Sequence, residues 1–350
     1  MIVKNEGTLL GRCLESVCDL VDEIIIVDTG SEDNTIEVAK SYGAKVYDFK
    51  WTDHFAEARN YSLSLSSCNW HFVLDADEYL LKGNRDSFNN LIETPNKIGI
   101  IRRIDKFSKD GVINHSQAFL SRIIPKGTKY TGRIHEQLNT NYPKINTAIE
   151  VYHDGYFLNE KSSRNLRLLK HYINEEKYND PYYLFQMAKE LRLTKKYNEA
   201  ELYYKKCYNH MSDMDSLRPY VVVDHLYNSI SSKNFTEGLN VITIEREFLN
   251  KYPDFHFVCG LFYMELVFSN VTKYIQYFPL IEREFLKCLE IGDTNQIDSV
   301  IGTGSFLAAY NLGVFYETIG NIGKAKEHYR VAVKYNYEPA IKRVSTLIEM

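Results

Sequence analysis

Acidic side chains gather directly after a short apolar run in the first quarter of the chain. In WHFVLDADEYL, residues 70–80, the run ends in Asp75, Ala76, Asp77 and Glu78. Three carboxylates so close together are costly to keep ionised unless something neutralises them. Carboxylate oxygens suit Mg²⁺ or Mn²⁺, and an ion held there could bind a diphosphate. The other interpretation is a negatively charged turn that caps the next helix.

The residues in front of these acids must position them. Phe72, Val73 and Leu74 form an apolar run without a turn residue, which predicts a strand buried on both faces. Ligands of open α/β sheets bind outside the carboxyl ends of the strands. Asp75 and Asp77 would therefore stand at a binding edge.

The first 80 residues alternate between strand and helix patterns. Strands are expected at residues 1–3, 21–27, 44–49 and 72–74, with a helical stretch between each pair. This rhythm predicts an α/β domain with a mainly parallel sheet.

Polar residues also follow the first two of these strands. Asn5 and Glu6 come after the first, and Asp28 after the second, so they would share a rim with the later acids. A single strand-terminal Asp usually caps a helix, but several polar endings on one rim favour a site. The glycine patterns of dinucleotide and P-loop sites do not occur in the sequence.

Composition is that of an ordinary globular protein. The 350 residues suit two domains, and the net charge of −4 gives no reason to expect nucleic-acid binding. The six cysteines form no C-x-x-C pair, which argues against a zinc site and fits a reducing compartment. No apolar stretch is long enough for a transmembrane segment, and the first residues lack the charged-then-apolar pattern of a signal peptide. We therefore expect a cytoplasmic protein.

Several ordered motifs resemble family 2 glycosyltransferases of the GT-A fold. They are MIVKNE, IIIVDTGSEDNT, FAEARN and VLDADE, followed by GRIHEQL at 132–138 and VYHDGY at 151–156. The resemblance covers about residues 1–165. It implies an inverting hexosyltransferase that uses a UDP-sugar with Mg²⁺ or Mn²⁺. Because the residues that normally precede MIVKNE are missing, we expect a shortened first strand and base-side pocket wall.

The resemblance also implies roles for individual residues. Asp28 would bind the uracil, Asp75 would lie near the ribose, and Asp77 would hold the metal. The uridine pocket would be lined by Asn5, Glu6, Arg59 and Asn60. A late histidine completes the metal shell in many such enzymes, which makes His153 a candidate ligand. The other interpretation of His153 is a structural histidine.

An inverting transfer needs a general base on the acceptor side of the sugar. Glu136, in the segment RIHE, is the candidate, and His135 is the alternative because imidazole titrates near neutrality. One of the two could instead be a structural partner of Arg133.

Two further strand-like runs, residues 98–104 and 118–124, would extend the sheet on the acceptor side. They carry Arg102, Arg103 and Arg122. These arginines could balance the acidic rim or the diphosphate, but solvated arginines are common and we assign them no role.

From about residue 180 the pattern is helical to the end. NLGVFY at 311–316 opens a match to the tetratricopeptide pattern, with a weaker copy at 184–207. The match continues with Gly320, Ala325, Tyr329 and Ala332. Residues 218–252 and 255–292 predict degenerate helical hairpins. We therefore divide the chain into a GT-A catalytic domain, 1–170, and a tetratricopeptide-like array of α-hairpins, 171–350.

The array would offer a concave surface to a peptide or a partner subunit, or would serve only as a scaffold or a homodimer contact. A family 2 domain followed by such hairpins is similar to the bacterial S-glycosyltransferases that modify a cysteine of a ribosomally made peptide, the sublancin-type bacteriocins. This likeness implies transfer to a Cys, or to a Ser or Thr, of a peptide or protein. One alternative is an enzyme that builds a surface polysaccharide or a lipid-linked glycan. Another is a non-catalytic scaffold with a vestigial nucleotide pocket.

Overall fold

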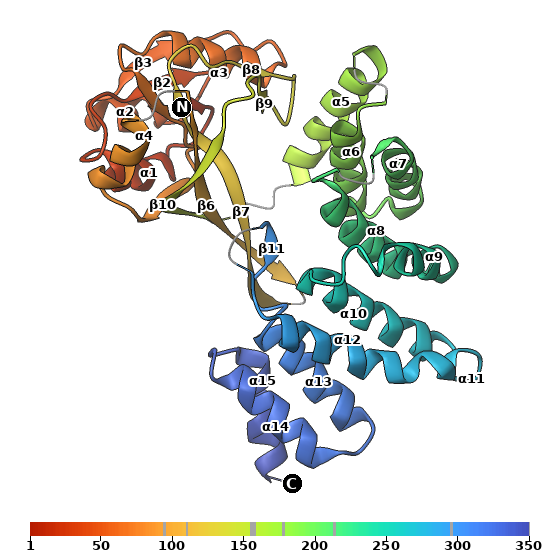
Figure 1. Ribbon diagram of the computed structural model, residues 1–350. Coiled ribbons are helices and arrows are strands. Elements are labelled where there is room, and N and C mark those ends of the chain that lie inside the picture. Colours follow the sequence, from red (N-terminus) through yellow and green to blue (C-terminus); the bar gives the residue numbers. More distant parts are fainter. Residues whose placement is uncertain are drawn as a thin grey trace. The chain divides into compact units, whose positions relative to one another are not determined.

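The computed structural model of the chain describes residues 1–93, 96–109, 111–154, 159–176, 179–212, 215–294 and 297–349. The chain forms two compact units (Figure 1): Met1–Ser108 with Ile113–Leu158, and Lys109–Val112 with Asn159–Met350. The first unit is α/β and the second is helical, as the sequence predicts. The domain boundary predicted at 170/171 falls inside helix α5 (Asn159–Glu175) and stays a prediction.

A parallel sheet of three strands opens the first unit, in the order β1-β2-β3. Its strands are β1 (Ile2–Val3), β2 (Ile25–Asp28) and β3 (Lys45–Asp48), joined by helices α1 (Leu10–Val17) and α2 (Thr35–Ser41). Parallel strands need such crossovers, and α1 buries its apolar face toward the core. All three strands end on one rim, and three of the candidate residues, Asn5, Glu6 and Asp28, stand at it.

The second sheet is mixed, with the order β7-β6-β10-β5 and β4 paired to β7. Its strands are β4 (Trp70–Phe72), β5 (Glu78–Lys82), β6 (Ile98–Lys109), β7 (Val112–Pro125) and β10 (Lys144–His153). Strand β10 runs parallel to β6 and antiparallel to β5, and β4 runs antiparallel to β7. The strands predicted at 98–104 and 118–124 are therefore present, and both are longer than predicted.

Shorter elements complete the unit. They are helix α3 (Phe55–Ser64), the 3₁₀ turn η1 (Arg85–Phe88), helix α4 (Asn89–Ile92) and the paired strands β8 (Tyr130–Thr131) and β9 (Gln137–Leu138). Helix α3 carries the FAEARN motif. The side chain of His54 caps this helix by accepting from the N–H of Glu57 at 3.3 Å.

Two strands of this unit differ from the prediction. The sequence predicts strands at 21–27 and 72–74, but β2 begins only at Ile25 and β4 ends at Phe72. One residue beyond each of these strands the backbone is still bonded to a neighbouring strand. The N–H of Lys45 donates to the carbonyl of Ile24 at 2.9 Å, and the N–H of Val73 donates to the carbonyl of Arg122 at 2.8 Å.

The second unit is a succession of helices. They are α5, α6 (Pro181–Leu193), α7 (Tyr197–His210), α8 (Arg218–Ser232), α9 (Phe235–Glu245), α10 (Pro253–Ser269), α11 (Val271–Tyr274), α12 (Phe278–Ile291), α13 (Phe306–Thr318), α14 (Ile322–Val333) and α15 (Glu338–Glu349). A 3₁₀ turn η2 (Ile275–Tyr277) and the short strand β11 (Ser299–Val300) complete it. The α6–α7 and α13–α14 hairpins confirm the two predicted repeats.

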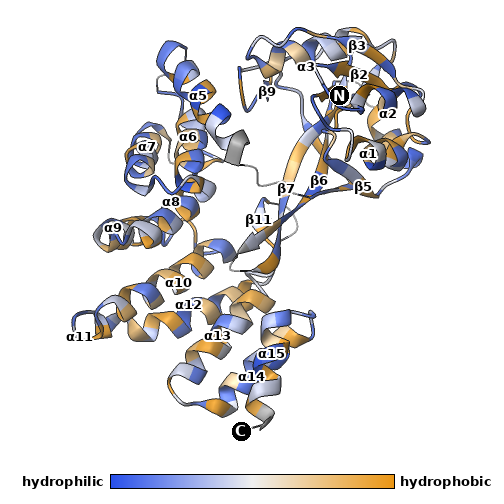
Figure 2. Cartoon of the chain, turned by 180° about the vertical axis from the view of Figure 1, so that it is seen from behind, coloured by the Kyte–Doolittle hydropathy of each residue, from blue (hydrophilic) through white to orange (hydrophobic). Residues whose placement is uncertain are grey.

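Small residues let paired helices approach in this unit. A Cβ atom added to Gly313 of α13 would lie 2.4 Å from the ring of Tyr329 in α14. Gly260 has the same relation to Phe285, at 2.7 Å. Helices α10 and α13 are apolar along much of their length (Figure 2), which fits their place in the largest core cluster. None of the described helices is both long and apolar enough to cross a membrane.

Candidate active site

Asp28 ends β2 at the rim and is almost fully buried, at 4% exposure. Its Oδ2 accepts hydrogen bonds from the N–H groups of Gly30 and Ser31, both at 2.9 Å. Its Oδ1 is buried and has no hydrogen-bond partner. Buried polar atoms are nearly always paired, so this oxygen is an acceptor that suits a bound N–H group.

The residues after β1 are tied to the same loop. Asn5 adopts a left-handed backbone (φ 54°), and its Oδ1 accepts from the N–H of Glu32 at 2.8 Å. Its own N–H donates to Ser31 Oγ, and the N–H of Glu6 donates to Thr35 Oγ1, both at 2.8 Å. The structure therefore brings Asn5 and Glu6 beside the loop that follows Asp28, as the sequence predicts for neighbouring strand ends.

Asp75 is held by two arginines from different elements. Arg59 of α3 donates to its Oδ1 at 3.2 Å, and Arg122 of β7 donates to its Oδ2 at 2.7 Å. Burial alone would raise the pKa of Asp75, but the two positive charges hold it well below its usual range. This carboxylate stays ionised and fixed in place.

Glu78 joins the same network, a role that the sequence analysis does not assign. It is 1% exposed, and its Oε1 accepts from Arg103 and Arg122, both at 3.0 Å. Two of the three clustered carboxylates, Asp75 and Glu78, thus face arginines of α3, β6 and β7. In the sequence, the only sign of this network is the presence of basic residues on β6 and β7. The register of these strands, which decides the partners of Glu78, cannot be read from the sequence.

Asp77 lies beside a histidine, whereas Asp75 and Glu78 face arginines. Its Oδ2 lies 3.3 Å from Nε2 of His153, the last residue of β10. The other ring nitrogen, Nδ1, lies 2.7 Å from Asp105 Oδ1. Burial would lower the pKa of His153, but these two carboxylates raise it to about 9. The structure therefore joins the two residues that the resemblance pairs at a metal.

The pair fits a divalent cation. One carboxylate oxygen and one ring nitrogen lie close enough to serve as neighbouring ligands, and the second nitrogen faces a carboxylate that would orient the ring. Mg²⁺ and Mn²⁺ are usually held by few protein ligands, with phosphate and water supplying the rest.

Glu136 lies between β8 and β9 and contacts Arg59. The Nε of Arg59 donates to Glu136 Oε1 at 2.7 Å, so one guanidinium links Glu136 to Asp75. Burial opposes the charge of Arg59, but Glu136 and Asp75 raise its pKa. His135, the alternative base, is half-buried and has a left-handed backbone with φ 51°.

Asn60 is engaged with the backbone of β8. Its amide nitrogen donates to the carbonyl of Tyr130, and its Oδ1 accepts from the N–H of Tyr130, both at 2.8 Å. These two bonds anchor β8 to α3. Its predicted place in the uridine pocket stays a prediction.

Among the described residues, a group of three possible metal ligands occurs in the helical unit. It consists of Glu201, His225 and Glu237. Lys205 already lies 3.6 Å from Glu201 and 2.8 Å from Glu237. Since this lysine neutralises both carboxylates, we assign no ion there.

The family of the N-terminal unit follows from comparison with known proteins. Residues 1–160 match the model of the family described as Glycosyl transferase family 2. The N-terminal part of this chain is a family 2 glycosyltransferase domain. This confirms the resemblance that the ordered motifs carry.

Curated relatives match this chain over part of their own length. The SPbeta prophage-derived glycosyltransferase SunS of Bacillus subtilis is 29% identical over 243 residues, which are 63% of this chain and 55% of that protein. A TPR repeat-containing protein of Synechococcus elongatus is 49% identical over 81 residues, 23% of this chain and 20% of that protein. The chain thus spans about half of the first relative and a fifth of the second.

Solved structures resemble the helical part. A tetratricopeptide repeat protein from Parabacteroides merdae is 14% identical, with a TM-score of 0.41, covering 54% of this chain and 66% of that one. The assignment of helical hairpins rests on the helices of this chain themselves.

Proposed function

We propose that the protein is an inverting glycosyltransferase that moves a sugar from a UDP-sugar to an acceptor on a peptide or protein. The observation that carries the proposal is the meeting of Asp77 and His153. Asp77 directly precedes β5 and His153 ends β10, and although they are 76 residues apart in sequence, Oδ2 of Asp77 and Nε2 of His153 lie 3.3 Å from each other. A carboxylate and an imidazole brought together where β10 ends and the antiparallel β5 begins could hold the divalent cation that binds the diphosphate of a nucleotide-sugar.

Donor binding is assigned to the rim beside this pair. Asp28 Oδ1, buried and unpartnered, would accept an N–H of the uracil ring. Asn5 and Glu6 would lie along the uridine pocket. The guanidinium Nη1 of Arg59 is also buried without a hydrogen-bond partner, which makes it a further donor toward the nucleotide.

Asp77 and His153 would hold Mg²⁺ or Mn²⁺. The ion would supply positive charge to the diphosphate as the bond to the sugar breaks. Asp105 would keep the His153 ring oriented through Nδ1. Asp75, already neutralised by Arg59 and Arg122, would remain an acceptor for the ribose and not a metal ligand.

Glu136 would remove the proton of the acceptor. Its side chain is 12% exposed and is held by Arg59, which is itself fixed by Asp75. The guanidinium of Arg59 would thus connect the base, Glu136, to Asp75, which is proposed to lie near the ribose of the donor. His135 is its neighbour and the alternative base.

A cysteine of a peptide is the proposed acceptor, with Ser or Thr as the oxygen counterpart. The support is the likeness in sequence to sublancin-type S-glycosyltransferases and the helical hairpins that follow the catalytic unit, which are suited to hold an extended peptide.

Donor turnover tests the proposal. Nucleotide release would be measured with UDP-glucose, UDP-N-acetylglucosamine and GDP-mannose, with Mn²⁺, and with a Cys-containing peptide or its Cys→Ser variant. We expect turnover of a UDP-sugar and, by mass spectrometry, one hexose on the Cys peptide. Transfer to a glycan or lipid acceptor alone would contradict the peptide assignment, and no turnover of any donor would contradict the enzyme assignment.

A further inference from the structure

The candidate base Glu136 lies on a short hairpin. Strands β8 and β9 pair in antiparallel fashion, and residues 132–136 form the loop that connects them. Two residues of this loop, Gly132 and His135, have left-handed backbones, with φ of 103° and 51°. A two-stranded hairpin is only marginally stable by itself in water. The place of Glu136 therefore depends on what the hairpin is bonded to.

Helix α3 holds this hairpin at the loop and at the base. The N–H of Phe55, the first residue of α3, donates to the carbonyl of Arg133 in the loop at 2.8 Å. One turn later, Nε of Arg59 donates to Oε1 of Glu136 at 2.7 Å. The guanidinium of Arg59 also lies 5.4 Å from the ring centroid of Tyr130 in β8. Backbone and side-chain groups of one helix thus bind both the loop and the base.

Asn60 of α3 pairs with β8 as a neighbouring strand would. Its Nδ2 donates to the carbonyl of Tyr130, and its Oδ1 accepts from the N–H of the same residue, both at 2.8 Å. A residue of an antiparallel strand exchanges both of its backbone bonds with the residue opposite it in the same way. The ring of Tyr130 is 7% exposed and belongs to an apolar cluster with Ala56 and Leu63, also of α3. Asn60 therefore fixes the start of the hairpin to the helix.

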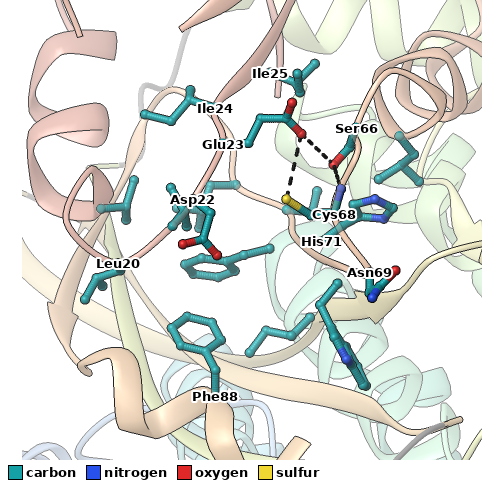
Figure 3. A pocket seen from close by; sticks show the side chains of 18 of the residues that line it. Leu20, Asp22, Glu23, Ile24, Ile25, Ser66, Cys68, Asn69, His71 and Phe88 are labelled. Carbon is teal, nitrogen blue, oxygen red and sulfur yellow. Dashed lines mark hydrogen bonds between the residues drawn. The ribbon is translucent and has the colours of Figure 1, made fainter. Parts of the chain in front are cut away.

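The other end of α3 is fixed to the parallel sheet. Directly after the helix, the hydroxyl of Ser66 and the N–H of Ser67 donate to Oε2 of Glu23, both at 3.0 Å. Figure 3 shows Glu23 and Ser66 joined in this way at the wall of a cavity. Lys45 of β3 donates to the same carboxylate at 2.6 Å. The helix that holds the hairpin is thus itself held at its far end.

We infer that Asn60 is a positioning residue for Glu136, acting through the backbone of β8. The inference rests on the proposed function, because it concerns the base of that reaction. It gives Asn60 a different role from the uridine contact that the resemblance implies, since Oδ1 and Nδ2 both bond to Tyr130. A displacement of about 1 Å at a reacting group can lower a rate about 100-fold. A looser hairpin should therefore lower kcat and leave donor binding nearly unchanged.

Asn60→Ala tests this role, with Ser64→Ala as the matched control. Ser64 is an exposed residue of the same helix, and its hydroxyl donates to the carbonyl of Tyr61 within that helix. We expect kcat for nucleotide release to fall by at least about tenfold in Asn60→Ala, with nearly the same affinity for UDP in calorimetric titration. Ser64→Ala should match the unchanged chain in both quantities.

The Glu136→Gln background separates a positioning role from a general loss of structure. If Asn60 acts through the base, Asn60→Ala should have little further effect on kcat once Glu136 is already replaced. An equal fall of kcat in both backgrounds would overturn the inference. A loss of UDP affinity with kcat preserved would also overturn it, because Asn60 would then be a nucleotide contact.

Hydrogen exchange gives a readout that does not depend on activity. The N–H of Tyr130, which donates to Asn60, should exchange at least about tenfold faster in Asn60→Ala. Asn60→Asp keeps an acceptor for this N–H and loses the donor to the carbonyl, so it should have an intermediate kcat. Unchanged exchange in Asn60→Ala would contradict the hold of α3 on the hairpin. Faster exchange in a protein whose unchanged chain turns over no donor would instead contradict the proposed function.

Discussion

Both units bury ionised side chains, but only one of them gathers these side chains at a common edge. In the helical unit, Arg218 of α8 and Glu245 of α9 pair at 2.7 Å, with Glu245 only 1% exposed. This pair links two neighbouring helices. In the α/β unit, Arg59 and Arg122 instead bind carboxylates that stand at strand ends. Buried charge by itself therefore does not mark a site, and we propose the site where such side chains converge beside strand ends.

The backbone shows the same contrast. Lys195 and Lys233 adopt left-handed conformations where α6 and α8 end, which is a common way to stop a helix. Asn5 adopts the left-handed conformation in the loop after β1, and His135 adopts it directly before Glu136, the candidate base. In the helical unit the left-handed conformation ends these two helices, and in the α/β unit it occurs at two of the proposed site residues.

The largest effect should come from Asp77→Ala. Loss of this carboxylate removes a proposed metal ligand at the diphosphate, so we expect turnover of the donor to fall by at least about 100-fold with circular dichroism unchanged. Asp48→Ala, at the exposed end of β3, is the matched control and should keep full activity. Turnover that survives excess chelator would show the metal assignment to be wrong.

Glu136→Gln should lower kcat strongly and leave donor affinity nearly unchanged. The amide can still accept the hydrogen bond of Arg59 but cannot take a proton, so a loss of roughly 100-fold or more in kcat is expected. Steady-state kinetics beside direct donor titration separates the two quantities. A normal kcat in this variant, together with an inactive His135→Gln, would move the base to His135.

Arg122→Gln and Arg218→Gln sharpen the comparison of the two units. Each removes an arginine from a carboxylate that is 1% exposed, and Arg122→Gln also removes one from Asp75, so we expect each to lower the free energy of unfolding by roughly 3 kcal/mol. Only Arg122→Gln should also weaken donor binding, because Arg122 holds Asp75. Urea denaturation and calorimetry measure the two effects. Equal donor affinity in both variants would contradict the distinction drawn between the units.

Gly313→Ala tests the close approach of α13 and α14. The added Cβ would lie 2.4 Å from the Tyr329 ring, which is fully buried, so a loss of about 1–3 kcal/mol in the free energy of unfolding is expected. Gly323→Ala is the control, since its nearest contact is at 3.9 Å and alanine favours a helix. Thermal unfolding of both variants distinguishes crowding from propensity, and equal stabilities would refute the crowding argument.

The smallest effect concerns Asp254 in α10. Burial raises its pKa to about 6, although the N–H of Val300 and the hydroxyl of Thr303 donate to it. The folded state therefore holds the proton more tightly than the unfolded state, and stability falls as pH rises from about 4 to about 6. Asp254→Asn should flatten this slope, by on the order of 1 kcal/mol, in unfolding curves measured across that range. An unchanged slope would assign it to another group.

Much of this fold is visible in the sequence because it depends on local patterns. The alternation of apolar runs with polar ends predicts the strands of the first unit, and the spacing of Gly313, Ala325 and Tyr329 predicts a repeat hairpin. The partners of Glu78 could not be predicted in this way. They lie on β6 and β7, whose register is set by packing and not by neighbouring residues.

The shortened strands teach a related lesson. Residues 21–24 have the composition of a strand, yet β2 begins only at Ile25, and in this segment the carbonyl of Ile24 accepts from the N–H of Lys45 at 2.9 Å. A strand needs a neighbour as well as a sequence. The meeting of Asp77 with His153, in contrast, was suggested by a family resemblance, and the sheet register of β10 brings it about.

Calorimetric titration with UDP and UDP-glucose, with and without Mn²⁺, tests the central claim most directly. The account predicts binding that requires Mn²⁺ in the unchanged protein and in Asp48→Ala, and that is lost in Asp77→Ala. Binding of equal strength with and without the ion would contradict the role of Asp77 and His153. Absence of binding by either nucleotide would contradict the proposal that this rim is a nucleotide-sugar site.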